Sequence, residues 1–172
     1  AMTVVNERTE EELSRIIYTY GEERFARKIA KSICEARKKS PIETTKRLAD
    51  IVKSCVPESR KGGHPAKKTF QAIRIEVNNE LSGLGEAISD IVSVLKPGGR
   101  IAVISFHSLE DRIVKQTFRT LASDCICDKS LPVCVCNHKA SVKLVGKYKP
   151  SAAETASNSR AQSATLRVAE KL

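Results

Sequence analysis

Apolar residues in the first half of the chain recur at three- and four-residue intervals, which is the spacing of amphipathic helices. This pattern predicts helices over residues 6–20, 22–37, 44–54 and 65–81. Thr9 and Glu12 fit a capping box in the first of them, and Gly21 separates it from the second. Pro65 suits the first turn of the last helix, where its missing amide hydrogen is not needed. The first half of the chain is therefore expected to be all-helical.

The pattern changes after Ser82-Gly83. The unbroken apolar run Arg100–Phe106 is typical of a strand buried on both faces of a parallel sheet. The remaining pattern predicts helices over 84–95 and 108–121, and strands over 142–149 and 164–170 with a loop between them. We therefore expect an α/β protein with a helical domain over 3–81 and a mixed domain over 82–172.

Charge is concentrated in one segment of the chain. The 172 residues carry a formal net charge of +10. Residues 24–74 alone hold 15 Lys and Arg against 4 Asp and Glu, a net of +11. A one-sided basic field favours a polyanion such as nucleic acid, although a solvated helix surface is the plainer interpretation. The sequence has no apolar run long enough for a bilayer and no secretory pattern, so a soluble, cytoplasmic protein without a membrane partner is expected.

Polar side chains line one face of the helix predicted over 65–81. They follow helical spacing, and Gln, Arg and Asn are groups that hydrogen-bond bases and phosphates. An ordinary polar outer face would show the same pattern. The candidate nucleic-acid contacts in the whole chain are Arg24, Arg27, Lys67, Lys68, Gln71, Arg74, Asn78 and Arg112.

A second group of candidates follows the apolar run. Ligands in open α/β sheets bind at the carboxyl ends of strands, and Ser105, His107, Ser108 and Glu110 lie at such an end. A histidine there could orient a substrate or relay a proton. In the simpler interpretation, Ser108 caps the following helix, Asp111 favours its N-terminus, and His107 hydrogen-bonds locally.

Four cysteines, Cys125, Cys127, Cys134 and Cys136, form a C-x-C-x6-C-x-C pattern. Four thiolates can bind tetrahedral zinc, but C-x-C is not the usual C-x-x-C spacing. The alternation with apolar residues suits a small hairpin with all four thiols on one face. Zinc, reduced thiols and disulfides all remain open. Cys34 and Cys55 fall on predicted helices and are expected in the core.

Four ordered blocks carry a resemblance that covers nearly the whole chain. They are the YGEERFA block at Tyr20–Ala26, the HPAKKTFQAIRI block at His64–Ile75 with its continuation to Leu81, the block from Leu95 to Arg112, and the tail Ser159–Glu170. Together they resemble the 16S ribosomal RNA cytosine-N4 methyltransferase H family.

The resemblance implies a fold and a reaction. The family has a Rossmann-like class I methyltransferase fold with a helical domain inserted after its fourth strand. By that likeness the chain is the C-terminal half of the fold, with its fifth, sixth and seventh strands, plus the inserted helical domain. The family uses S-adenosylmethionine to methylate N4 of a cytidine in the decoding region of the small-subunit ribosomal RNA, so 16S rRNA and the small ribosomal subunit are the expected partners.

The family's glycine-rich donor loop has no counterpart in this sequence, which contains no G-x-G-x-G segment. We therefore expect a fragment without the donor-binding half, with no cofactor-binding residue of its own and no activity in isolation. The fifth strand would lack its neighbour in the sheet, and its open edge could mediate a homodimer.

Two other functions compete with an rRNA methyltransferase. One is a non-enzymatic RNA-binding module derived from the same fold. The other is a basic helical DNA-binding domain, which would have no need for the apolar strand Arg100–Phe106.

Overall fold

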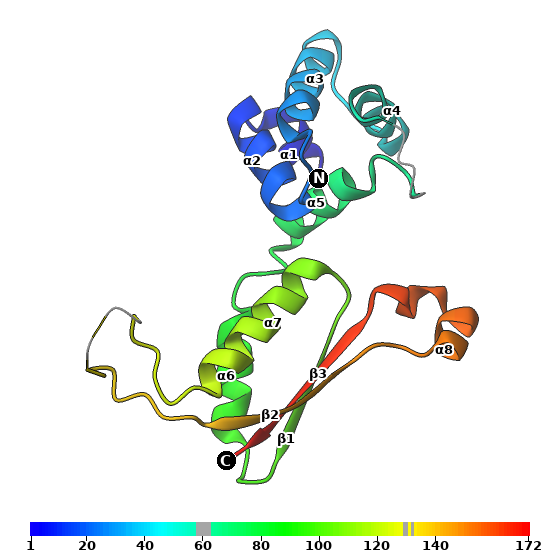
Figure 1. Ribbon diagram of the computed structural model, residues 1–172. Coiled ribbons are helices and arrows are strands. Elements are labelled where there is room, and N and C mark those ends of the chain that lie inside the picture. Colours follow the sequence, from blue (N-terminus) through cyan, green and yellow to red (C-terminus); the bar gives the residue numbers. More distant parts are fainter. Residues whose placement is uncertain (58–62, 129–130, 132) are drawn as a thin grey trace. The chain divides into compact units, whose positions relative to one another are not determined.

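The computed structural model describes residues 1–57, 63–128, 131 and 133–172 (Figure 1). The chain divides into two compact units, Ala1–Glu80 and Leu81–Leu172. Each unit has its own apolar core. No helix in the described ranges is long and apolar enough to cross a membrane.

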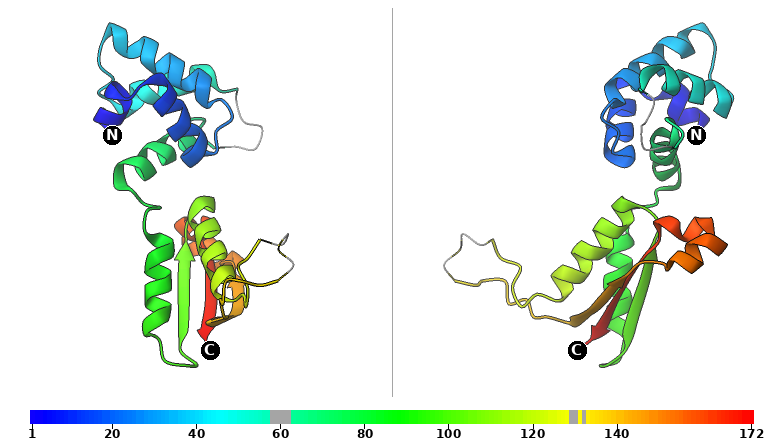
Figure 2. Two further views of the ribbon diagram at one scale, coloured as in Figure 1. Left: turned by 90° about the vertical axis from the view of Figure 1, so that its left-hand side faces the viewer. Right: turned by 45° about the vertical axis from the view of Figure 1, so that its right-hand side comes forward.

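The first unit is helical. Its core is built around residues such as Leu13, Ile17, Ile29, Ile33 and Val52, all of them fully buried. The central helix α2 (Glu10–Gly21) packs against both α3 (Ala26–Lys39) and α5 (Lys67–Asn78) (Figure 2). Cys34 and Cys55 are buried in this core, which confirms their predicted place. The helices are α1 (Met2–Glu7), α2 (Glu10–Gly21), α3 (Ala26–Lys39), α4 (Thr45–Cys55) and α5 (Lys67–Asn78).

Several predicted helix ends in this unit were wrong, among them the start at Pro65, because α5 begins at Lys67. The helix predicted over 6–20 is two helices, because Thr9 is the N-cap of α2. The predicted capping box is confirmed, with Glu12 N donating to Thr9 Oγ1 at 3.2 Å and Thr9 N to Glu12 Oε2 at 2.8 Å. Helix α3 starts later than expected because Glu22 takes a left-handed backbone conformation. Asn79 does the same after α5, which therefore ends before Leu81.

The second unit is an α/β layer. Its elements are α6 (Leu84–Val94), β1 (Arg100–Ser105), α7 (Ser108–Leu121), β2 (Val142–Tyr148), α8 (Ala152–Ser157), the 3-10 helix η1 (Ser159–Ser163) and β3 (Thr165–Lys171). The three strands form one sheet in the order β1-β3-β2, and both pairs are antiparallel. Helices α6 and α7 pack together and share a core with all three strands (Figure 1).

The prediction of a parallel strand buried on both faces was wrong for β1. Its hydrogen-bonded neighbour in the described sheet is β3, which runs antiparallel. Ile101 and Ser105 face the core, whereas Ile104 on the other face is 58% exposed. Helices α6 and α7 therefore cover one face of β1, and the apolar side chain of Ile104 on its other face stays exposed.

The expected loop between β2 and β3 was also wrong, because α8 and η1 lie there. Ser151 caps α8, with Glu154 N donating to its hydroxyl at 3.1 Å. No residue of α8 is buried, so it left no apolar stripe in the sequence.

Candidate nucleic-acid interface and strand-end site

A groove of about 840 Å³ opens on the helical unit beside α2 and the start of α3. Two predicted contacts, Arg24 and Arg27, line it, and both are exposed. The Arg24 guanidinium lies 5.2 Å from the ring centre of Phe25, a cation–π contact that orients it. The lining residues are Glu10, Glu11, Ser14, Arg15, Tyr18, Arg24, Ala26 and Arg27.

Arg15 and Tyr18 were missed by the sequence reasoning. They lie one helical turn apart on α2, and Tyr18 is 65% exposed. An exposed tyrosine beside arginines is a combination that stacks a nucleobase and binds its phosphate. The available signal was that Tyr18 falls outside the apolar stripe of its helix.

Two of the predicted contacts on α5 hold the helical unit together. Lys68 Nζ donates to the Glu22 carbonyl at 3.0 Å, and Gln71 Nε2 donates to the Tyr20 carbonyl at 3.1 Å. Both bonds satisfy carbonyl groups at the C-terminal end of α2, which have no partner within that helix. These side chains therefore fix α5 against α2, and Gln71 is half-buried in doing so.

Two more predicted contacts bind a carboxylate. Arg74 donates to both oxygens of Glu80, at 2.8 and 3.0 Å, and Asn78 Nδ2 donates to Glu80 Oε1 at 2.9 Å. The pairing offsets the charge of Arg74. Lys67 is the remaining predicted contact on α5. Its side chain is exposed, and no hydrogen bond or ion pair of that side chain is seen among the described residues.

Part of the basic excess in residues 24–74 is structural as well. Arg37 donates to the carbonyls of Val5 and Arg8 at 2.9 and 2.7 Å. Arg47 donates to those of Pro41 and Ala36 at 2.6 and 3.2 Å. These bonds to neutral carbonyls leave the charge of both guanidinium groups in place, so Arg37 and Arg47 still add to the basic field while their side chains are held by the helical unit.

At the end of β1, His107 and Glu110 form a reciprocal cap on α7. Glu110 N donates to His107 Nδ1 at 3.3 Å, and Glu110 Oε2 accepts from the backbone of Phe106 and His107 at 2.8 and 3.2 Å. His107 Nε2 lies 3.4 Å from Glu110 Oε1. The N-cap is therefore His107, and the interpretation of Ser108 as the cap was wrong.

The other strand-end candidates have different surroundings. Ser105 is 3% exposed, and its hydroxyl donates to the Thr165 carbonyl on β3 at 3.3 Å. Ser108 is the first residue of α7, and Arg112 is exposed one turn further along. Among these candidates, the side chains of His107 and Glu110 lie close to each other, with His107 Nε2 3.4 Å from Glu110 Oε1.

An ion pair ties α7 to the sheet. Arg167 of β3 binds both carboxylate oxygens of Asp111, at 2.7 and 2.9 Å. The hydrogen bonds and charge of this guanidinium hold the pKa of Asp111 below its usual value of 3.8, against a smaller opposing effect of burial. The first turn of α7 is thereby anchored over β3.

Replacing Asp111 with Asn should lower the free energy of unfolding by about 1–2 kcal/mol at neutral pH. A carboxyl whose pKa is lower in the folded state contributes stability above its unfolded pKa and loses it as the pH falls through the folded value. The difference between wild type and variant, measured by urea unfolding, should therefore shrink below about pH 4. Asp90→Asn, on the exposed face of α6, should change stability by less than about 0.5 kcal/mol. A gap for Asp111→Asn that is unchanged in acid would contradict this role of the ion pair.

The four cysteines of the loop between α7 and β2 converge. Their ligand atoms all lie within 4.8 Å of one another, and all six cysteines of the chain are free thiols. The predicted hairpin was wrong, because the described residues around the thiols form no strand. Backbone amides of Ile126 and His138 lower the pKa of the Cys136 thiol to about 6.

Comparisons with known proteins identify the family of this chain. The family model described as the MraW methylase family matches residues 1–172, the entire chain. The chain belongs to the MraW methylase family. Curated relatives agree with this assignment. The ribosomal RNA small subunit methyltransferase H of Halothermothrix orenii is 53% identical over 173 residues, covering 98% of this chain and 56% of that protein.

Two further relatives carry the same name. The protein of Clostridioides difficile is 52% identical over 176 residues, covering all of this chain and 57% of its own length. That of Fusobacterium nucleatum is 53% identical over 174 residues, covering all of this chain and 55% of its own length. The chain therefore spans a little over half of the curated relatives that it matches.

Proposed function

We propose that this member of the MraW methylase family recognises small-subunit (16S) ribosomal RNA for S-adenosylmethionine-dependent methylation of a cytidine N4 amine. The observation that carries the proposal is the identity of about half of all positions, across the full chain, to relatives named ribosomal RNA small subunit methyltransferase H. The groove on the helical unit, in which Arg15, Arg24 and Arg27 outnumber the two carboxylates Glu10 and Glu11, supports a polyanionic substrate. An rRNA substrate implies a cytoplasmic site of action.

In the proposal the two units have different tasks. The helical unit is the inserted substrate-recognition domain, and the second unit is the C-terminal half of a Rossmann-like methyltransferase domain. The antiparallel order β1-β3-β2 suits the fifth, seventh and sixth strands of that fold. The turn at His107 and Glu110 then lies at the carboxyl end of the fifth strand, where open α/β sheets bind ligands.

Methyl transfer to the cytosine amine depends mainly on how the two reactants are positioned. The cytosine amine is a weak nucleophile because its lone pair is delocalised into the ring. An enzyme helps by aligning the nitrogen with the transferred methyl group and by accepting a hydrogen bond from the amine. The cytosine must also leave its stack or lie in an unpaired strand. S-adenosylmethionine supplies the methyl group.

The residues of this chain do not fit the donor. Class I donor sites need a glycine-rich turn after a strand so that the backbone approaches the cofactor closely. The sequence holds no G-x-G-x-G segment, and its Gly98-Gly99 pair precedes β1. We therefore assign no donor contact and no methyl-transfer step to the residues of this chain.

Disrupting the gene that encodes this chain tests the proposal. Mass spectrometry of nuclease fragments of purified 16S rRNA should show the loss of N4-methylated cytidine at a single site, and the intact gene should restore it. An unchanged content of N4-methylated cytidine would reject the proposal. Retained rRNA binding together with that result would favour the alternative, a non-enzymatic RNA-binding module from the same fold.

We also propose that a second copy of the chain pairs with β1. Among the described strands β1 has a neighbour on one edge only, and Ile104 and Phe106 beside that edge are 58% and 55% exposed. Sedimentation of the isolated chain should show a dimer that Ile104→Lys weakens and that Ala152→Lys, on the exposed helix α8, leaves intact. A strict monomer at all concentrations would reject self-pairing.

A further inference from the structure

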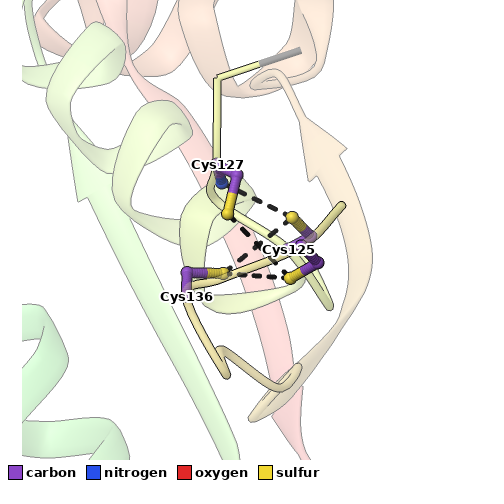
Figure 3. A group of neighbouring side chains, drawn as sticks. Cys125, Cys127 and Cys136 are labelled. Carbon is purple, nitrogen blue, oxygen red and sulfur yellow. Dashed lines mark hydrogen bonds between the residues drawn. The ribbon is translucent and has the colours of Figure 1, made fainter. Parts of the chain in front are cut away.

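The sulfur atoms of the loop between α7 and β2 surround a common point. Cys127 Sγ lies 3.9 Å from Cys134 Sγ, Cys134 Sγ lies 3.6 Å from Cys136 Sγ, and Cys136 Sγ lies 3.9 Å from Cys125 Sγ. Figure 3 shows the thiols of Cys125, Cys127 and Cys136 turned toward one another. The four cysteines come from two short segments, 125–127 and 134–136, which the loop brings close together.

These spacings match a metal site. Zinc–sulfur bonds of about 2.3 Å in a tetrahedron place neighbouring sulfur atoms about 3.8 Å apart. A disulfide would require about 2.05 Å between the two sulfur atoms. The three distances of 3.6, 3.9 and 3.9 Å therefore have the length of a tetrahedral edge. The remaining separations among the four sulfur atoms do not exceed 4.8 Å.

Backbone amides are directed at the sulfurs. Ile126 N donates to Cys136 Sγ, Cys127 N to Cys125 Sγ, and Val135 N to Cys127 Sγ, each at 3.4 Å. Such donors stabilise negative charge on sulfur and orient a ligand before the metal arrives. The C-x-C spacing serves this arrangement, because the middle residue of each pair, Ile126 or Val135, supplies one amide. The third amide belongs to Cys127 itself.

The two ends of the loop, residues 121–124 and 138–141, form its neck and are joined by hydrogen bonds that do not involve the thiols. His138 Nδ1 lies 2.7 Å from the Ser123 carbonyl, and Ala140 N donates to Asp124 Oδ1 at 3.2 Å. Ser141 N donates to the Leu121 carbonyl at 2.8 Å, where α7 ends. These bonds hold the two cysteine segments near each other. The ligand atoms that converge among the described residues of this loop are those of the four cysteines, and His138 is not in that group.

We propose that Cys125, Cys127, Cys134 and Cys136 bind one zinc ion in a closed tetrahedral site. The four thiols release their protons to solvent as the zinc–sulfur bonds form. Zinc remains divalent, so no electron is transferred. With four protein ligands the site has no open position for substrate, and its role is to fix the loop between α7 and β2.

The metal content of the full chain tests this directly. The chain is purified under reducing conditions, and zinc is measured by elemental analysis and by native mass spectrometry. One zinc per chain is expected, and Cys127→Ser or Cys134→Ser should reduce it to background. Cys34→Ala, which removes a buried cysteine of the helical unit, should retain one zinc. Cobalt in place of zinc should show the charge-transfer and visible absorption of a tetrahedral thiolate site.

Several results would overturn the proposal. A reduced chain that stays metal-free after zinc is added would do so, as would stable disulfides within the cluster under reductant. Iron at full occupancy in place of zinc would reject the assigned metal. A Cys127→Ser or Cys134→Ser variant that folds and keeps one zinc would reject the four-cysteine ligand set. The wild-type stoichiometry decides the matter even if a cysteine variant fails to fold, and none of these measurements depends on methyl transfer.

Discussion

Replacing Arg24, Arg27 and Lys67 together with alanine should weaken the binding of the chain to 16S rRNA at least about tenfold at moderate salt, a cost of about 1.4 kcal/mol. All three side chains are exposed, and the two arginines line the groove on the helical unit. Each lost phosphate contact lowers the slope of log affinity against log salt by about 0.7 on single strands. The triple variant should therefore flatten the slope by about 2, as measured by fluorescence titration at several salt concentrations.

A matched charge change provides the control. Lys115→Ala with Arg119→Ala and Lys143→Ala also removes three exposed cations, but from the second unit. It should leave the salt slope nearly unchanged. Equal effects of the two triples would mean that net charge alone drives binding, and the helical unit would then lose its role as the recognition surface.

Replacing Gly21 with alanine should destabilise the helical unit by about 1–3 kcal/mol. In an open helix the same change stabilises by about 1 kcal/mol, because alanine is the better helix former. Here an added methyl would lie 2.8 Å from the Lys68 carbonyl oxygen and 3.4 Å from Ala72 Cβ. Because a backbone atom of α5 cannot rotate away, α2 and α5 must separate.

Urea unfolding followed by circular dichroism measures this cost. Thr19→Ala, an exposed position two residues earlier on α2, should change stability by less than about 0.5 kcal/mol. The separation of α2 and α5 should also weaken the bonds that Lys68 and Gln71 make to the end of α2. A Gly21→Ala variant as stable as wild type would contradict the close approach of the two helices.

Element positions were predictable where caps and apolar stripes agree. Helix α7 was predicted with its observed bounds, and α4 within one residue, because each combines an apolar stripe with a clear start. The outer face of β1 was not predictable in the same way. An apolar run indicates that a strand prefers burial, but the exposure of Ile104 depends on which elements cover the sheet.

The candidate site was predictable as a region and less so in its details. Helical spacing placed Gln71 and Arg74 on a polar face, but it could not reveal that the Tyr20 carbonyl and the Glu80 carboxylate would bind them. Those partners arise from tertiary packing and from the left-handed turn after α5. His107 was recognised as notable, yet its capping role was missed because histidine is not among the usual N-cap residues.

Crosslinking of the purified chain to small ribosomal subunits tests most directly whether the helical unit is the rRNA-recognition surface. Ultraviolet irradiation followed by mass spectrometry of the peptide–nucleotide adducts locates both partners of each contact. We expect adducts at residues 15–27 and near Lys67, joined to 16S rRNA of the decoding region. Adducts confined to residues 100–172, or none to the decoding region, would contradict it.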